Sequence, residues 1–430
     1  MLKQKLIALL KNKQNAHLAI YGFGQGFNLV TPLLAIPYIV SKCGIANYGK
    51  IGVGLAVSFF LIVIIDFGSD IIGVKEISVN RDNPQMLEKI FVTTYTAKFL
   101  LMLFLIGILS VLFVFVPYFN TEKSLFFLCL PILVGQFINP VWFFQGIENF
   151  NMITALNFAT KLLYLFGVFV FIKSPGDYIY VNLWWGLGMI IPFLIGFCLC
   201  VAKFNFSFST LKMADVADFI KEDYKFCISQ LFLSLKNYSP IMLIGFLGGF
   251  TVAGQYKIIE QVIMPFRTYL QVFFRFFYPK LCYEIFQDKR AGLSYWKKIN
   301  VVNFAIVLFL LALVFIFSTP ILTFFKVEKE NLASLSEILR FALLIPLFIT
   351  GSFTLEQLLF SIGKKSMYIN ITIITVIINF IMMYFLFRSY GLYGLITSIL
   401  ITETMVMLSY SVILKPFFNQ ISIENGHHTI

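Results

Sequence analysis

Long apolar runs separated by short charged connections dominate this sequence. Twelve such runs of roughly twenty residues or more can be drawn along its 430 residues. About twenty apolar residues in a helix cross the ~30 Å hydrocarbon core of a bilayer. Within lipid, a helix satisfies every backbone polar group inside its own segment. The pattern therefore predicts an all-α polytopic membrane protein with about twelve transmembrane helices.

Composition agrees with this class and excludes others. Hydrophobic residues make up 59% of the chain and charged residues 13%, whereas soluble domains have roughly 45–50% and about 25%. A water-soluble enzyme or a nucleic-acid-binding protein could not bury so much apolar surface. The net charge of +12 would suggest a nucleic-acid partner in a soluble domain. Here most Lys and Arg lie in connections, where they set membrane orientation, and we expect no nucleic-acid partner.

The predicted spans are 16–41, 51–72, 90–116, 124–145, 151–172, 178–202, 224–248, 252–279, 299–325, 335–361, 367–387 and 391–414. The connections that share a side with the two termini carry about twice as many Lys and Arg as the opposite connections. The positive-inside rule therefore places both termini in the cytoplasm. The basic stretch at residues 1–14 has too short an apolar core for a cleaved signal peptide and is expected to lie on the membrane as an amphipathic segment.

A basic connection after the sixth span divides the chain into six plus six helices, residues 1–208 and 209–430, the second ending in a short cytoplasmic tail. Glycine-rich turns recur in the two halves, at Gly44–Lys50 and Gly249–Lys257. Because six is even, the halves share one orientation and are related by an axis along the membrane normal. We predict two six-helix bundles in a parallel pseudo-two-fold repeat around a central cavity.

The connections leave no room for a catalytic domain. The two longest, about 203–223 and 280–298, are short, which counts against an enzyme. The six cysteines form no metal-ligand pattern, and the pair Cys198 and Cys200 has no second pair or His cluster beside it. We expect no metal site and no cofactor, and leave coupling to H+ or Na+ open.

Several motifs resemble the polysaccharide or O-antigen (Wzx-type) flippases of the multidrug/oligosaccharidyl-lipid/polysaccharide exporter superfamily. They are Pro37–Ile39, Gly44–Gly49, Asp66–Gly68, Lys75–Ile77, Asn139–Glu148, Asn157–Tyr164, Lys173–Tyr178, Ala253–Tyr256 and Tyr278–Leu281. The resemblance implies a bacterial inner-membrane flippase that moves an undecaprenyl-pyrophosphate-linked oligosaccharide, an O-antigen or related repeat unit, from the cytoplasmic to the periplasmic leaflet by alternating access. It also implies the lipid-linked oligosaccharide, membrane lipids and the polysaccharide polymerase and chain-length machinery as partners.

The eighth span has the clearest polar face. Glu260, Met264, Arg267, Gln271 and Arg275 recur at helical spacing, so they share one face. Lipid cannot solvate such a face, which should line a cavity or a neighbouring helix. Two simpler interpretations stay open: ion pairs between helices for Glu260 and Arg267, and snorkelling to the interface for Arg275.

A pyrophosphate needs cations, and Arg offers a fork of donors. The candidates are Arg267, Lys161, Lys236 and Arg275. A glycan needs amides and aromatic faces. The polar candidates are Gln145, Asn157, Gln261, Gln271, Asn28 and Asn237. The acidic residues are candidates for gating or for ion coupling, and pairing with Lys or Arg is the favoured role for the two in the family motifs, Asp66 and Glu148. The acidic set is Asp66, Asp70, Glu148, Glu260, Glu356 and Glu403.

Three alternatives remain. An exporter of small amphiphilic drugs belongs to the same superfamily, but a cavity for cationic drugs should be acidic or apolar, unlike the Lys and Arg stripe. A membrane enzyme acting on lipid-linked sugars would change covalent structure. A non-transporting scaffold would need no aligned intramembrane charges.

Overall fold

The computed structural model describes residues 30–210 and 212–426, and every secondary-structure element within them is helical. The described helix Val30–Cys43 is followed by α3 (Ile45–Asp66), η1 (Ser69–Gly73), α4 (Val74–Val79), α5 (Pro84–Phe115), α6 (Pro117–Asn120), α7 (Lys123–Phe127), α8 (Leu130–Ile138), α9 (Val141–Gly146), α10 (Phe150–Phe171), η2 (Pro175–Tyr178), α11 (Ile179–Phe204), η3 (Phe208–Thr210), α12 (Met213–Leu247), α13 (Gly249–Gln287), α14 (Lys289–Ile316), α15 (Ser318–Phe324), α16 (Lys329–Ala342), α17 (Leu344–Ser361) and α18 (Lys365–Gly426).

All twelve predicted spans correspond to helices in the described part of the chain. Eight stretches there are long and apolar enough to cross a membrane. One of them, Met367–Gln420, contains two predicted spans, which Gly391 separates with φ 57° and ψ −136°. Val30–Cys43 is the described part of the first span, and α12 and α13 are the seventh and eighth, whose charged residues lower their hydropathy. The prediction of an all-α polytopic membrane protein is confirmed.

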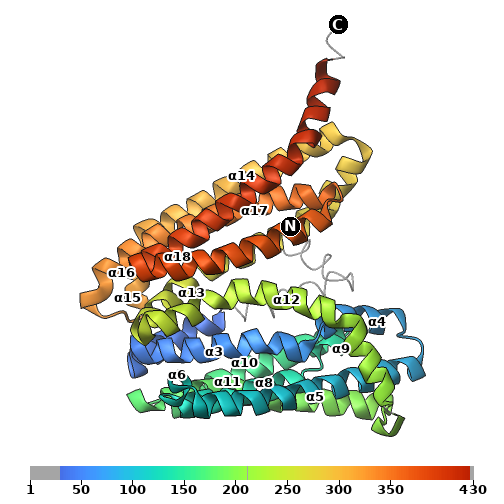
Figure 1. Ribbon diagram of the computed structural model, residues 1–430, viewed down its shortest axis with the longest axis vertical. Helices are drawn as coiled ribbons and strands as arrows, with labels where there is room; N and C mark the ends of the chain where they lie inside the picture. Colours follow the sequence, from blue (N-terminus) through green and yellow to red (C-terminus); the bar gives the residue numbers. More distant parts are fainter. Residues whose placement is uncertain (1–29, 211, 427–430) are drawn as a thin grey trace, which may run out of the picture. The chain divides into compact units, whose positions relative to one another are not determined.

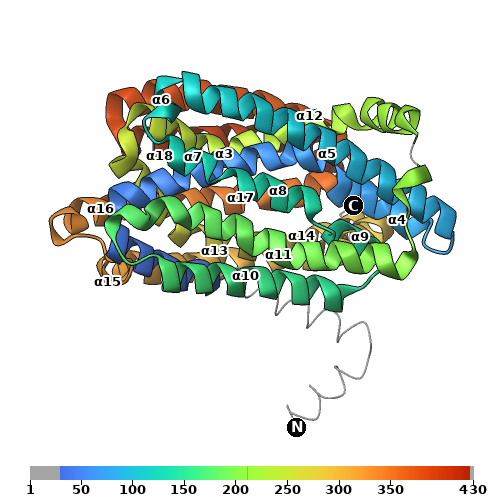
Figure 2. The ribbon, with the colours of Figure 1, turned by 90° about the horizontal axis from the view of Figure 1, so that it is seen from below.

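The first unit is held together by close approach of its helices. Contacts group residues 1–246 into this unit, in which α11 lies beside α8 and α10 (Figure 2). A Cβ at Gly186 would lie 2.6 Å from Pro131 Cβ and 2.7 Å from the Pro131 backbone carbon. Only a residue without a side chain allows α11 to approach α8 so closely, as is common between membrane helices.

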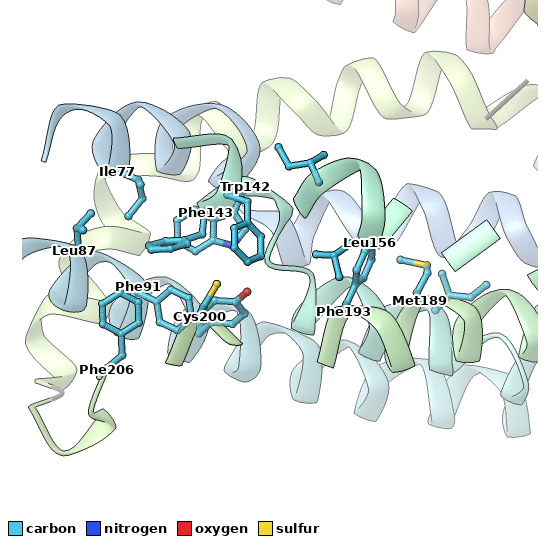
Figure 3. Packing of buried hydrophobic residues seen from close by; sticks show 14 of the residues in the cluster. Ile77, Leu87, Phe91, Trp142, Phe143, Leu156, Met189, Phe193, Cys200 and Phe206 are labelled. Atoms are coloured by element: carbon cyan, nitrogen blue, oxygen red, sulfur yellow. The ribbon is translucent and has the colours of Figure 1, made fainter. Parts of the chain in front are cut away.

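One end of the first unit contains an aromatic core. Phe91, Trp142 and Phe143 are almost fully buried there, together with Phe206, which follows α11 (Figure 3). The rings of Phe91 and Phe206 lie 4.6 Å apart, and those of Phe91 and Phe143 lie 5.3 Å apart in an edge-to-face arrangement. Such pairs add to the stabilisation from burial. The motif containing Trp142 and Phe143 therefore has a packing role.

The second unit, residues 247–430, is built around α13, α14, α17 and α18. Here α17 packs against α18, and α13 against α14 and α17; Figure 1 shows α14, α17 and α18 side by side. Its core contains Leu281 of α13, Leu358 and Leu359 of α17, and Leu414 of α18, each fully buried.

Several predicted boundaries differ from the structure, among them the end of the second span and the connection predicted over 280–298. The span predicted over 51–72 ends at Asp66, because Phe67 (φ 45°) and Gly68 (φ 85°) adopt left-handed conformations. A Cβ at Gly68 would also lie 2.8 Å from Phe226. The predicted connection over 280–298 is instead helical apart from Asp288, whose side chain accepts a hydrogen bond from the Arg290 backbone N–H and caps α14.

The helix α12 is grouped with the first unit. The predicted division at residue 208 lies before α12, whereas contacts divide the chain after Phe246. The contacts that connect α12 to earlier segments include the ion pair of Asp215 with Lys89 (2.9 Å), and the ring pairs Phe67–Phe219 and Tyr118–Phe246. The predicted internal repeat stays a prediction.

Candidate functional site

Asp66 forms the centre of a buried polar network in the first unit. It lies at the last turn of α3, and the left-handed residues that follow direct the chain into the π-helix η1. Lys98 of α5 lies 3.1 Å from Asp66 Oδ1. Gln136 of α8 donates from Nε2 to both carboxylate oxygens, at 2.9 and 2.8 Å. Three helices therefore meet at one carboxylate.

The Lys98 ammonium is the most buried charge in this network. Its side chain is 1% exposed, and it donates to Ser69 Oγ at 3.1 Å. The Tyr95 ring lies beneath it, with the centroid 5.9 Å away. A buried charge persists only where partners compensate its desolvation. The partners of Asp66 were not predicted, although an intramembrane Lys such as Lys98 signals a nearby carboxylate.

A cavity of about 280 Å³ opens beside this network. Its polar lining comes from two segments, residues 66–70 and α12, and consists of Asp66, Asp70, Gln230, Ser234 and Asn237. Ser234 is 5% exposed, and its hydroxyl has no partner within the described chain. Asp70 lies beyond the apolar span Ile45–Asp66; desolvation by the surrounding protein, followed by repulsion from Asp66, raises the pKa of its carboxyl. The cavity thus presents both acidic and neutral hydrogen-bonding groups.

An aromatic path leads from this cavity to Lys161. Phe59 and Tyr238 line the cavity, with ring centroids 5.8 Å apart. Phe59 also contacts Trp185 of α11 at 5.7 Å. Lys161 Nζ lies 4.1 Å from the Trp185 centroid, in cation–π geometry. Among the described carboxylates, none forms an ion pair with Lys161.

In the second unit, the residues of the predicted polar stripe on α13 differ in whether they have partners. Glu260 pairs with Lys257 on the same helix, with 2.6 Å between Oε2 and Nζ. Arg267 lies two turns further on and is half-buried; its Nε is buried and has no hydrogen-bond partner among the described residues. The interpretation of Glu260 and Arg267 as inter-helix ion pairs is therefore wrong for the described chain. Arg267 is left with donors for an anionic ligand.

The remaining polar candidates are dispersed. Gln271 and Arg275 are exposed on α13, Gln261 is buried, and Gln145 is exposed on α9. Asn157 is half-buried on α10, one turn before Lys161. Asn237 lines the cavity of the first unit, and Lys236 is half-buried and has an interaction partner. Asn28 lies outside the described residues.

The acidic candidates fall into two groups. Asp66 and Glu148 each pair with a cation, as favoured; Glu148 lies 3.6 Å from Arg81 and its side chain is 65% exposed. Glu403 of α18 is buried and accepts a 2.6 Å hydrogen bond from Ser352 Oγ. Glu356 and Glu403 both lie near Tyr410. Gating or ion coupling by Asp70, Glu356 or Glu403 stays a prediction.

Comparison with known families identifies the chain. Residues 16–281 match the family described as “Polysaccharide biosynthesis protein”. The match spans more than half of the sequence, from the first span into α13, and includes Asp66, Lys98, Lys161 and Arg267. The chain belongs to this family. The predicted resemblance to polysaccharide exporters is confirmed.

Two curated proteins named “Putative O-antigen transporter” are similar to it. The Escherichia coli K12 protein is 23% identical over 274 residues, which cover 64% of this chain and 66% of that protein; the match thus spans just under two thirds of that relative. The Shigella dysenteriae protein is 23% identical over 387 residues, covering 89% of this chain and 96% of the relative. Both names describe transporters and not enzymes, as predicted.

Solved structures show the same fold at low sequence identity. An inward-facing multidrug resistance MATE transporter of the MOP superfamily superposes with a TM-score of 0.70 at 15% identity, covering 96% of this chain and 98% of the other. The lipid II flippase MurJ in an inward closed conformation gives 0.71 at 13% identity, covering 92% and 87%. This family member therefore has the fold of MOP-superfamily transporters.

Proposed function

We propose that this protein is a flippase for an undecaprenyl-pyrophosphate-linked oligosaccharide, which it moves by alternating access from the cytoplasmic to the periplasmic leaflet of a bacterial inner membrane, with both termini in the cytoplasm. The polysaccharide biosynthesis family, the transporter names of the curated relatives and the lipid II flippase among the structural neighbours support this proposal. The substrate would be an O-antigen or a related repeat unit. Polysaccharide polymerase and chain-length proteins are its proposed partners.

The observation that carries the proposal is Lys161 stacked on Trp185 at the end of the aromatic path. A lipid-linked oligosaccharide joins an anionic pyrophosphate directly to sugar rings. Lys161, which pairs with no carboxylate among the described residues, supplies charge for the first part. The neighbouring aromatic faces and the amides of Gln230 and Asn237 suit the second. The same few side chains thus match both chemical parts of the substrate.

The first test concerns Lys161. A host whose flippase gene is deleted should accumulate intact lipid-linked repeat units on the cytoplasmic leaflet, and the wild-type gene should restore surface polysaccharide. Lys161→Ala should abolish export with unchanged protein abundance in the membrane, because the anionic head group loses its cation. Lys173→Ala is the matched control, since Lys173 is exposed just beyond the same helix; it should export normally.

Full export by Lys161→Ala would contradict the role of this lysine. Repeat units that reach the periplasmic leaflet unpolymerised in the deletion host, or that lack a sugar, would contradict the flippase and favour an enzyme acting on lipid-linked sugars. Efflux of cationic dyes by the purified protein, with no movement of lipid-linked glycan, would favour the drug exporter.

Arg267 provides the second test. Arg267→Ala should abolish export, whereas Arg267→Lys separates charge from geometry: it keeps one positive charge but loses the planar fork that binds two phosphate oxygens. We expect Arg267→Lys to export poorly. Arg388→Ala, at an exposed arginine of α18, is the control. Normal export by Arg267→Ala would exclude Arg267 from substrate binding.

A further inference from the structure

The second unit contains a groove on the side of α13 that faces away from the polar stripe of that helix. The groove has a volume of about 610 Å³ and lies between α13 and α14. At about 100° per residue, Phe276 and Lys280 lie roughly 180° and 220° around the helix from Arg267. The groove therefore faces away from the residues proposed to bind the transported substrate.

The lining of the groove is apolar along its length and cationic at one end. Its apolar part consists of Tyr269, Val272, Phe273, Phe276, Phe277, Ile299, Val302 and Ile306. Phe276 is 75% exposed and Val302 54%. Lys280 and Lys298 complete the lining, and both are exposed.

The antiparallel arrangement of α13 and α14 brings the two lysines to the same depth. The helices are joined at Asp288, and each lysine lies about 12–15 Å along its helix from that point. The Lys280 ammonium lies 4.9 Å from the centroid of the Tyr295 ring on α14, which confirms this register. The charged ends of both side chains therefore lie at one mouth of the groove.

The length of the groove fits a lipid acyl chain within one leaflet. From Tyr269 to Lys280 the groove runs about 16 Å along α13, close to half of the ~30 Å hydrocarbon core. Basic pockets between membrane helices bind anionic lipid head groups. A polyprenyl carrier chain would extend well beyond a groove of this length.

We propose that this groove binds an anionic glycerophospholipid, with one acyl chain along the apolar lining and the phosphate between Lys280 and Lys298. In the predicted topology the lipid lies in the cytoplasmic leaflet, because the connection predicted over 280–298 is basic and lies on the side of the two termini. The site is separate from the transported glycan, so it does not rest on the proposed function.

Native mass spectrometry of the purified full-length protein tests the site directly. The probes are dioleoyl phosphatidylglycerol and dioleoyl phosphatidylethanolamine, added without any glycan. The wild-type protein should retain the anionic lipid in preference to the zwitterionic one. At about 1 kcal/mol for each lysine near the surface, Lys280→Gln with Lys298→Gln should weaken phosphatidylglycerol binding roughly 30-fold.

The control for charge is Lys221→Gln with Lys225→Gln, which removes two exposed lysines of α12, one of them also beside a tyrosine. It should bind the lipid like the wild type. The control for the apolar part compares two neighbours on α14: Val302 lines the groove and Val301 does not. Val302→Trp, by displacing about two methylene groups of the chain, should weaken binding about tenfold, and Val301→Trp should not.

Equal retention of both lipids by the wild type would overturn the proposal. The proposal would also be overturned if the lysine double variant and Val302→Trp both bound phosphatidylglycerol as tightly as the wild type does. Displacement of phosphatidylglycerol by undecaprenyl phosphate would assign the groove to the transported lipid and would also overturn it. Because the readout is retained lipid, these outcomes are independent of the export results for Lys161 and Arg267.

Discussion

Two intramembrane cations, Lys98 in the first unit and Arg267 in the second, differ in their partners. In the first unit, Lys98 is fully buried and has a carboxylate, a hydroxyl and an aromatic ring around it. In the second, Arg267 is half-buried and its Nε has no partner among the described residues, while the nearby Glu260 pairs with Lys257 instead. Desolvation makes an unpaired buried charge costly. A buried cation whose charge is paired therefore indicates a structural role. A cation with free hydrogen-bond donors indicates a role in ligand binding.

Breaking the satisfied network should give the largest effect on stability. Asp66→Ala leaves the Lys98 ammonium buried without its counter-ion, which typically costs about 3–5 kcal/mol. We expect a marked fall in the thermal unfolding midpoint of the purified protein in detergent, and lower abundance in the membrane.

The double variant Asp66→Ala with Lys98→Met distinguishes charge from packing. A neutral side chain of similar length removes the uncompensated charge, so most of the lost stability should return. If Asp66→Ala alone unfolds at the wild-type temperature, the network is not a structural element and its charges are free to act in transport.

Substitution of one glycine in each unit extends the comparison, with a smaller expected effect on stability. At Gly186 in the first unit a Cβ would meet the backbone of Pro131, whereas at Gly351 in the second it would meet the flexible side chain of Met407 at 2.5 Å. Overpacking against backbone costs about 1–3 kcal/mol. Gly186→Ala should therefore lower the unfolding midpoint clearly, and Gly351→Ala should lower it less because Met407 can adopt another rotamer. The reverse order would contradict this explanation.

Arg267 should give the smallest effect on stability despite its effect on export. Its Nε makes no hydrogen bond to the described chain, so Arg267→Ala removes no partner and should change the free energy of unfolding by less than about 1 kcal/mol. The same thermal measurement checks this. A loss comparable to that of Asp66→Ala would show that Arg267 has a structural role.

Local patterns were sufficient to predict the helices. Span length and hydropathy located each helix, because each transmembrane helix satisfies its own backbone. They missed some ends, since α12 begins at Met213 and α14 at Lys289, well before the predicted residues 224 and 299. The end of α3 was placed too late, since the left-handed turn at Phe67 and Gly68 interrupts an apolar run without changing its hydropathy. The spacing along α13 also predicted which residues share its polar face.

The sequence by itself determined the membrane class, the helices and the residues that carry charge within them. Only the tertiary structure decided which of these charges are satisfied. Lys98 and Gln136 are 32 and 70 residues from Asp66, and the aromatic path to Lys161 joins residues from α3, α10, α11 and α12. Helical periodicity defines the face on which a residue lies, but a partner is determined by how that face packs against another helix, and packing depends on the shapes of both.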